Sequence, residues 1–343
     1  MHPRFRLLAG WCLAAALAAS CSPAAGANRA KPPFSPQPTR TPAATTAAVD
    51  PASVHANELG MVPVLMFHML LPRPKGNYDI TPAAFVSMLG RLYREGYRPI
   101  TAAELAAGRV DTPAGTHPVV LTFDDATRSQ FALAGDTVAP GTAVALLQAF
   151  ARTSPGFRPV ATFYVNRDPF GYADAARPLG WLHRNGFDIG DHTFDHVPLS
   201  RLDDTGVQKE LVLGQRVIAD ALPGTTVTTM ALPLGLHPKN RALSVRGSYS
   251  GTTYEFGAVM QVGAGPAPSP YSVDYDPGGV PRMRASLWRP GSPVDYSGGY
   301  WLDWLARHPT KRYISDGNPD TVSFPRALAP RVAPAFAAAA RPY

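Results

Sequence analysis

Residues 119–125 read VVLTFDD, an apolar run that leads directly into two adjacent carboxylates. β-Branched and other apolar residues dominate the first five positions, which favours a strand buried on both faces. Asp124 and Asp125 then place two like charges at the carboxyl end of that strand. A solvated turn would tolerate both, because turns favour Asp for its local hydrogen bonds to the backbone. The alternative is a functional site, which requires a partner elsewhere in the chain that needs a carboxylate.

Short apolar runs recur along the chain and alternate with helical patterns. The predicted strands span residues 62–69, 119–123, 160–165, 187–190, 228–232, 257–262 and 312–315. The clearest predicted helix runs over 82–95 with Thr81 as N-cap, and Thr101 with Glu104 forms a capping box at a second helix start. Strands that alternate with helices imply parallel pairing and right-handed crossovers. We therefore expect an α/β fold, either a (β/α) barrel or an open doubly wound sheet.

The first 21 residues do not follow this pattern. Arg4 and Arg6 precede an apolar run over 7–19 that is followed by small residues, which is typical of a secretory signal and too short for a membrane span. The stretch LAASC ends at Cys21 and resembles a bacterial lipobox, in which the cysteine becomes the lipidated first residue. We expect residues 1–21 to be a lipoprotein-type signal peptide, with ordinary cleavage a few residues later as the alternative. Either reading places the protein outside the cytoplasm, as a cell-surface lipoprotein or a secreted protein.

Composition divides the rest of the chain. Residues 22–58 are rich in Pro, Ala and Thr and bury too little apolar surface to fold, so we expect a disordered tether. Residues 59–325 would form the main folded domain, and 326–343 a C-terminal tail. Loss of Arg4 and Arg6 with the signal lowers the net charge by two, from +7 to +5. The basic residues are scattered, without the runs typical of nucleic-acid binding, so we expect no nucleic-acid partner.

A second polar motif follows the predicted strand at 187–190. Residues 191–196 read DHTFDH, and His192 and His196 are four apart. On a helical turn they would share one face, with roughly 5–6 Å between Cβ atoms, so both rings could turn toward one ion. The carboxyl ends of strands converge in either α/β architecture, which would bring Asp125 to the same place.

Two imidazoles and one carboxylate leave coordination positions open, as in a catalytic metal centre. These ligand types favour zinc, and the same donors accept cobalt or nickel. The triad also serves non-haem Fe(II) oxygenases, which need a reducing cofactor that nothing in the sequence suggests.

TFDD at 122–125 and HTFDH at 192–196 together resemble the first two motifs of the polysaccharide deacetylases of carbohydrate esterase family 4, the NodB-homology domain. That family writes these motifs TFDD and H-[ST]-x-x-H. The resemblance covers roughly residues 62–235 well and the remainder loosely. It implies a distorted (β/α) barrel that removes N- or O-acetyl groups from wall or capsule polysaccharides.

The resemblance also implies a role for each motif residue. Asp124 corresponds to the general base, while Asp125 joins His192 and His196 on the metal. The bound cation would offset the repulsion between the two carboxylates and acidify its water. The third motif of the family, R-x-P-Y-G, corresponds to ALPLG at 231–235. Its Pro and Gly are kept, so we expect the Leu234 N–H to help stabilise the oxyanion.

Two side chains of this third motif differ from the family. Ala231 stands where the family has the arginine that orients the base, and Leu234 stands where it has tyrosine. The stretch VPRMRAS offers a substitute, since Arg282 or Arg284 could supply a guanidinium from a different strand. This hypothesis requires one of the two to reach Asp124.

The histidine that protonates the leaving amine lies in a late L-x-x-H motif in most of the family, and we assign no counterpart of that late motif in this sequence. Residues 63–68 read PVLMFH instead, which resembles the opening strand, P-V-L-x-[YF]-H, of the poly-N-acetylglucosamine deacetylase subgroup. The resemblance implies that His68 is the general acid, a role that suits histidine near neutral pH. A strand-end histidine satisfied in the core is the alternative.

The remaining polar and aromatic candidates have plainer interpretations. Asp191 could hydrogen-bond a metal-bound ring, and Asp195 could do the same or be solvated. Two interpretations exist for the aromatic residues near 300: they line a glycan groove or, as the four-residue spacing favours, pack on the buried face of a helix. The insertion at 126–159, with a predicted helix over 142–151, could shape the substrate cleft. The histidines expected to be structural or exposed are His117, His183, His237 and His308, and the aromatic residues are Tyr296, Tyr300, Trp301 and Trp304.

Two functional classes follow from the sequence. The favoured one is a metal-dependent deacetylase that acts on an N-acetylated cell-wall or extracellular polysaccharide and meets the membrane only through a lipidated Cys21. The alternative is a catalytically impaired glycan-binding protein on the same fold, which the altered third motif keeps open.

Overall fold

The structure is a computed structural model that describes residues 49–263, 265–286 and 297–343. The expected signal peptide at 1–21 lies outside the described residues, and the expected tether at 22–58 is described only from residue 49 onward. Among the helices of the described part, none combines the length and the apolar character that a bilayer span requires.

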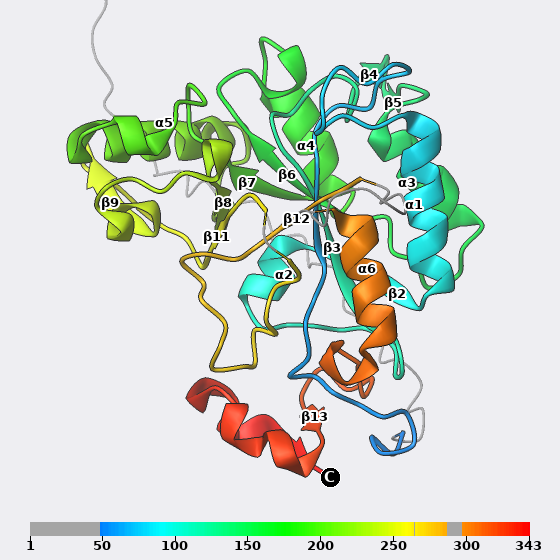
Figure 1. Ribbon diagram of the computed structural model, residues 1–343. Coiled ribbons are helices and arrows are strands. Elements are labelled where there is room, and N and C mark those ends of the chain that lie inside the picture. The colour runs from blue at the N-terminus through cyan, green and yellow to red at the C-terminus, as the bar shows by residue number, and fades with distance from the viewer. Residues whose placement is uncertain (1–48, 264, 287–296) are drawn as a thin grey trace, which may run out of the picture. The chain divides into compact units, whose positions relative to one another are not determined.

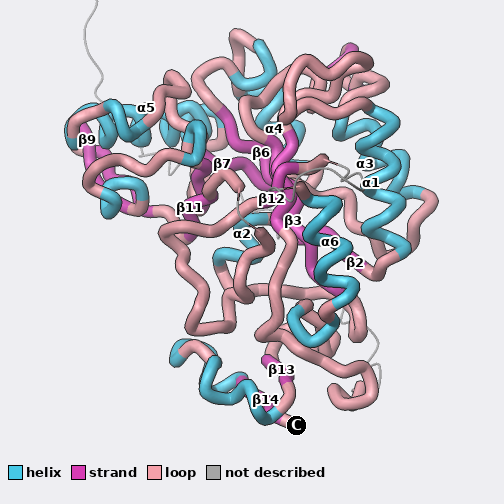
Figure 2. The backbone as a smooth tube through the Cα atoms, viewed as in Figure 1, coloured by secondary structure: helices cyan, strands magenta, loops and turns pink. Residues whose placement is uncertain are grey.

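A curled parallel sheet of eight strands forms the centre of the fold (Figure 2). Its strand order is β11-β8-β7-β6-β3-β1-β12, with β2 paired to the first half of β3. This arrangement is the distorted (β/α) barrel that the resemblance implied, one of the two α/β architectures that the sequence pattern left open. The strands are β1 (Val64–Phe67), β2 (Tyr97–Ile100), β3 (His117–Phe123), β6 (Thr162–Val165), β7 (Asp188–Asp191), β8 (Thr229–Ala231), β11 (Ala258–Met260) and β12 (Met283–Arg284).

Helices surround this sheet (Figure 1), and α1 shows why they form where they do. The Thr81 side chain caps it by accepting the Ala84 N–H at 3.0 Å, and Pro82 occupies its first turn. Its buried face of Phe85, Met88, Leu89 and Leu92 is worth about 1.5–3 kcal/mol per side chain. The helices are α1 (Pro82–Arg94), α2 (Ala102–Ala106), α3 (Ala143–Arg152), α4 (Ala176–Arg184), α5 (Asp204–Ala221) and α6 (Gly298–Arg307).

Period-two alternation along β3 decides which side chains face the barrel interior. Val119, Leu121 and Phe123 pack in the outer core, and Val120 packs in a separate inner core. Because successive side chains point to opposite faces of a strand, Asp124 follows Val120 and Thr122 on the inner side. The strand therefore delivers the first aspartate of VVLTFDD to the interior.

Several sequence predictions needed correction. The stretch 312–315 forms two isolated bridges, Met61 with Arg312 and Asn57 with Ile314, so its prediction as a strand was wrong. Sequence reasoning also missed β2, which contains Pro99. A proline is tolerated there because β2 pairs with β3 alone, so one side of the strand needs no backbone N–H donor. The two-residue β12 is too short to leave a periodic pattern.

Smaller elements lie outside the eight-stranded sheet. The residues expected as a C-terminal tail, 326–343, form two 3₁₀ helices and a strand that pairs with β13. The short strands are β4 (Leu133–Ala134), β5 (Thr137–Val138), β9 (Arg246–Tyr249), β10 (Thr252–Glu255), β13 (Val322–Phe324) and β14 (Ala340–Pro342). The 3₁₀ helices are Pro169–Gly171, Leu199–Arg201, Pro233–Gly235, Arg241–Ser244, Pro309–Lys311, Arg326–Arg331 and Pro334–Ala339.

Candidate active site

Asp125, His192 and His196 converge at the carboxyl ends of β3 and β7. The Asp125 Oδ1 lies 3.4 Å from the His192 Nε2 and 3.3 Å from the His196 Nε2. One donor atom of each residue lies within 4.8 Å of the other two. Bonds of about 2.0–2.2 Å in a tetrahedral zinc site set neighbouring ligand atoms about 3.3–3.5 Å apart. The three side chains that the sequence grouped together therefore fit one divalent cation.

A main-chain carbonyl fixes the orientation of the His192 ring. The His192 Nδ1 lies 2.8 Å from the carbonyl oxygen of Ala231, which assigns the proton to Nδ1 and leaves Nε2 free to bind a cation. The suggestion that Asp191 orients a ligating ring was wrong. Its Oδ1 accepts the Thr193 N–H at 2.7 Å instead.

His192 and His196 lie on a loop and not on the helical turn that their spacing suggested. Thr193 has a φ of 66° and His196 a φ of 55°, so the chain curls through left-handed positions. Glu210 of α5 holds this loop, since its carbonyl accepts the Phe194 N–H at 3.2 Å and its carboxylate accepts the Asp195 N–H at 2.8 Å. The loop sets the two ring centroids 4.9 Å apart.

Backbone strain gathers at this site. Eight described residues other than glycine have positive φ, and five of them lie in the loops that carry the predicted site residues. Each costs of order 1–3 kcal/mol, and such residues cluster where function requires an unusual backbone. The five are Asp125, Ala126, Thr193, His196 and Leu234.

Asp124 is buried and paired with Arg282. Its side chain is at most 2% exposed, the Arg282 side chain is 0% exposed, and the two form a bidentate pair with both N–O distances at 2.7 Å. Arg282 also donates to the Thr122 hydroxyl at 3.1 Å and to the Gln261 carbonyl at 2.8 Å. Burial alone would raise the pKa of Asp124, but Arg282 and His192 hold that pKa well below its usual range. Asp124 is therefore a carboxylate at any physiological pH.

The two candidate arginines thus have different places. Arg282, immediately before β12, meets the requirement that a guanidinium reach Asp124. The Arg284 guanidinium lies 5.7 Å from the centroid of the Tyr78 ring instead.

His68 follows β1 and lies within electrostatic reach of both aspartates. Burial lowers the pKa of His68, while Asp124 and Asp125 act in the opposite direction without reversing the shift. Its ring lies 4.9 Å from the Tyr78 ring, centroid to centroid. The Nδ1 is buried and has no hydrogen-bond partner among the residues that the structure describes.

The turn expected from the third motif follows β8. Leu234 has a φ of 55° inside the 3₁₀ turn Pro233–Gly235, and the residue is 61% exposed. Gly235 has a φ of 69°, and a Cβ there would come within 2.7 Å of the Val262 Cβ, so the turn requires glycine. The motif keeps its backbone geometry although its arginine and tyrosine are replaced. The oxyanion role of the Leu234 N–H stays a prediction.

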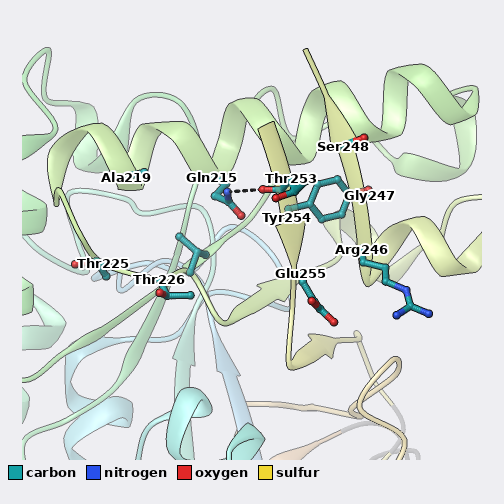
Figure 3. A pocket seen from close by; sticks show the side chains of 11 residues that line it. Gln215, Ala219, Thr225, Thr226, Arg246, Gly247, Ser248, Thr253, Tyr254 and Glu255 are labelled. Carbon is teal, nitrogen blue, oxygen red and sulfur yellow. Dashed lines mark hydrogen bonds between the residues drawn. The ribbon is translucent and has the colours of Figure 1, made fainter. Parts of the chain in front are cut away.

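A cleft of about 360 Å³ adjoins the Asp-His-His group. Arg167 pairs with Asp195 there at 2.7 Å, so Asp195 is an ion-pair partner in the cleft wall. A larger pocket of about 680 Å³ lies between α5 and the β9–β10 hairpin (Figure 3), and none of its lining residues is a predicted site residue. The smaller cleft is the better candidate for the active site, because Asp125 and His196 line it. Its lining residues are Asp125, Asn166, Arg167, Asp168, Phe194, Asp195 and His196.

The other sequence candidates lie away from the Asp-His-His group. His117 is buried with its Nδ1 2.8 Å from the Tyr313 carbonyl, and burial lowers its pKa to about 4. His308 stacks on Trp304 at 4.2 Å. Tyr300, Trp301 and Trp304 belong to α6, and Tyr296 lies outside the described residues. Two amides near the site, Gln130 and Asn166, were missed, because no motif marks them.

Comparison with known proteins agrees with this site. Residues 111–247 match the family described as polysaccharide deacetylase. A chitin deacetylase of Arthroderma benhamiae is 33% identical over 73 residues, 21% of this chain and 20% of that protein. The match thus spans only a fifth of that relative. The segment that carries both motifs is therefore similar to the polysaccharide deacetylase family.

Solved structures show the same fold. The Streptococcus pyogenes deacetylase PplD, solved in complex with acetate, aligns with a TM-score of 0.50 and 18% identity over 66% of this chain and 92% of its own. A polysaccharide deacetylase from Bacillus cereus aligns with a TM-score of 0.50 and 20% identity over 65% and 64%. The curled sheet is therefore a distorted barrel of the polysaccharide deacetylase type.

Proposed function

We propose, from the match of residues 111–247 to the polysaccharide deacetylase family, that this protein is a metal-dependent polysaccharide deacetylase. Its substrate would be an N-acetylated cell-wall or extracellular glycan, and the reaction would hydrolyse the acetyl–nitrogen bond. The observation that carries the proposal is the pairing of two adjacent aspartates with different partners. Asp124 is held by Arg282, and Asp125 shares a cation-sized space with His192 and His196.

The residues present divide the chemistry among themselves. Asp125, His192 and His196 would hold a divalent cation, most simply zinc, with cobalt or nickel accepted by the same donors. When bound, that cation supplies Lewis acidity and lowers the pKa of water. Asp124 stays ionised and accepts a proton from the attacking water, while Arg282 keeps both carboxylate oxygens in place. The Leu234 N–H would donate to the developing oxyanion.

His68 is the proposed proton donor to the leaving amine. Its position after β1, as in the poly-N-acetylglucosamine deacetylase subgroup, supports this assignment. Burial lowers the pKa of His68, so its imidazolium is a stronger acid toward the leaving amine, while a smaller fraction of the ring is protonated near neutral pH.

The glycan-binding alternative has lost part of its support. It rested on the altered third motif, in which Ala231 and Leu234 replace the family's arginine and tyrosine. Arg282 brings a guanidinium to Asp124 from another strand, so the missing arginine no longer argues against catalysis.

An acetate-release screen with elemental analysis tests this function. Purified protein with zinc should release acetate from chitooligosaccharides, poly-N-acetylglucosamine or peptidoglycan. Asp124→Asn should lower the rate by at least about 10²-fold, the usual contribution of a general base, and leave the zinc content unchanged. A wild-type protein that holds zinc, binds these glycans and releases no acetate would favour the glycan-binding protein.

We also propose export with a lipid anchor on Cys21. The basic start, the apolar run and the LAASC stretch support this proposal. Cys21→Ser should move the protein from the membrane fraction to the soluble fraction outside the cytoplasm. Soluble wild-type protein would show simple secretion instead.

A further inference from the structure

Two side-chain amides bridge main-chain carbonyls where neighbouring strands of the barrel separate. The Gln130 Nε2 donates to the carbonyls of His68 at 2.9 Å and Asp124 at 2.6 Å. The Asn166 Nδ2 donates to the carbonyls of His192 at 2.6 Å and Thr193 at 3.0 Å. The Gln130 amide thus joins two functional positions from different strands, and the Asn166 amide holds two consecutive carbonyls at the first metal ligand.

The Gln130 side chain forms its hydrogen bonds just past the end of the β1–β3 ladder. The register runs to Phe67 opposite Phe123, and the Asp124 N–H still donates to the Phe67 carbonyl at 3.0 Å. Beyond this point the chain turns at Asp125, whose φ is 71°. Gln130 is 0% exposed and places its NH₂ group between the next two carbonyls. An amide NH₂ has two hydrogens, so it can satisfy both at once.

The amide oxygen of Gln130 is occupied as well. Its Oε1 accepts the Thr127 N–H at 3.2 Å, which fixes the direction in which the NH₂ group points. A carboxylate in the same place would face two carbonyl oxygens with acceptors only. The position therefore requires a donor group and not merely a side chain of this size.

Asn166 directly follows β6 and plays a related part at the end of the β6–β7 ladder, where both of its acceptors lie on the β7 side. The β6–β7 register runs to Val165 opposite Asp191, and the His192 N–H donates to the Val165 carbonyl at 3.0 Å. Asn166 then takes the two carbonyls that follow, at the start of the loop that carries both histidines. Each amide adds hydrogen bonds beyond the last backbone pair of a ladder. Gln130 does so at the proposed acid and base, and Asn166 does so at the start of the loop that carries the two histidine ligands.

We infer that Gln130 is a positioning residue that fixes the distance between the proposed acid, His68, and the proposed base, Asp124. Asn166 fixes the metal loop in the same way. The functional part of this inference rests on the proposed deacetylase reaction, because that reaction assigns the roles of His68 and Asp124. Arg282 holds the Asp124 carboxylate, whereas Gln130 holds the main chain that carries it. A misplacement of about 1 Å between reacting groups can cost about 10²-fold in rate.

Substitutions at the two amides should therefore change different quantities. Gln130→Met removes both donors at similar size and should lower kcat about 10- to 100-fold while KM and the zinc Kd stay near wild type. Gln130→Glu should lower kcat at least as much. Asn166→Leu should weaken zinc binding by about 10- to 100-fold, the usual cost of losing support behind a metal ligand. Gln215→Met is the matched control, since that amide donates to the Thr253 carbonyl at 3.1 Å in the remote pocket of Figure 3.

A second readout does not depend on turnover. In zinc-loaded protein with labelled histidine, Gln130→Met should shift or broaden the ring signals of His68 and leave those of His192 and His196 in place. This measurement keeps the positional claim testable even if the wild-type protein releases no acetate, an outcome that would remove the proposed function alone. If Gln130→Met does not fold, the shorter amide of Gln130→Asn replaces it, with the same expected shift in the His68 signals.

The inference is overturned if Gln130→Met keeps kcat within about twofold of wild type, well short of a positioning effect. It is also overturned if the variant moves all three histidine signals equally, or if it weakens zinc binding as much as Asn166→Leu does.

Discussion

At the scale of single residues, the site depends on a buried ion pair that crosses the barrel. Asp124 and Arg282 belong to segments that are 158 residues apart, and each is the principal charge partner of the other. A buried pair contributes little net stability compared with an apolar pair, but loss of one partner leaves an uncompensated charge. The arginine therefore orients the base and makes its burial tolerable.

Arg282→Met should lower the free energy of unfolding by about 3–5 kcal/mol, the usual cost of breaking a buried pair. Acetate release should fall with it, because the pKa of Asp124 loses its main lowering influence. The control is Arg241→Met, which removes an exposed pair with Asp276 at 3.2 Å and should cost at most about 1 kcal/mol. Urea denaturation measures both. Equal losses in the two variants would contradict the importance of the buried pair.

The sequence predicted those site residues that belong to a recognisable motif. Asp124, Asp125 and the two histidines were identified because each motif ends a strand, and strand ends converge in an α/β fold. The substitute arginine could be narrowed only to Arg282 or Arg284. Register and side-chain direction decide between them, and a two-residue strand gives no pattern from which to read either. Gln130 was not predictable, because its role depends on where a ladder of hydrogen bonds stops.

At the scale of elements, α5 packs against β7 and supports the metal loop from behind. Gly214 allows this approach, since a Cβ at that position would lie 2.2 Å from the Asp191 Oδ1 and 3.0 Å from the Thr193 carbonyl carbon. Glycine in a helix interior costs roughly 0.5–1 kcal/mol relative to alanine. Here the close contact with the loop accounts for it.

Gly214→Ala should therefore destabilise the fold by about 1–3 kcal/mol and weaken zinc binding, because Asp191 and Thr193 must move. Gly90→Ala is the matched control in α1, where the nearest atom to the new Cβ is the flexible end of Arg94 at 3.1 Å. That variant should gain about 0.5–1 kcal/mol. Thermal unfolding and zinc titration of both variants check this. Retained stability and zinc affinity in Gly214→Ala would show that the loop does not depend on the helix.

Elements with local signals were predictable, and those set by distant contacts were not. The α1 helix was predicted over 82–95 and ends one residue earlier, at Arg94. It could be predicted because its N-cap, its proline and its buried face are all local to this stretch of sequence. The loop at 192–196 was predicted as a helical turn, because nothing in Thr193 or His196 announces a left-handed backbone. Glu210 of α5 holds that loop, and sequence reasoning could not place α5 beside it.

At the scale of the whole described domain, one buried carboxyl joins segments from both ends of the chain. Glu58 is 1% exposed and accepts the Tyr313 hydroxyl at 3.0 Å and the Ser323 N–H at 2.8 Å. The Ser269 hydroxyl donates to the main-chain carbonyl of Glu58 at 2.5 Å. The expected tether boundary at residue 58 thus coincides with a residue that the fold encloses. Composition could not show this, because the contacts come from residues more than 200 positions away.

Glu58 should make the stability of the domain fall as pH rises. Burial, with Asp316 nearby, raises the pKa of Glu58 from 4.5 to about 8. Between these values the folded state keeps a proton that the unfolded state has lost, so unfolding becomes easier by up to about 1.4 kcal/mol per pH unit. His117, with its pKa lowered to about 4, has the opposite effect below about pH 6.5, where the unfolded state binds a proton that the folded state does not. Between about pH 6.5 and 8, the effect of Glu58 on stability is therefore observed without that of His117.

Glu58→Gln tests this assignment through a slope and not through an absolute stability. Asp191, whose pKa burial also raises to about 8, adds a decline of the same sign in wild-type and variant protein alike. The difference between the two proteins therefore isolates Glu58. Urea denaturation across the window should give a shallower decline for Glu58→Gln by up to about 1.4 kcal/mol per pH unit. Parallel declines would mean that Glu58 is ionised in the folded domain, and that the hydrogen bonds from Tyr313 and Ser323 compensate for its burial.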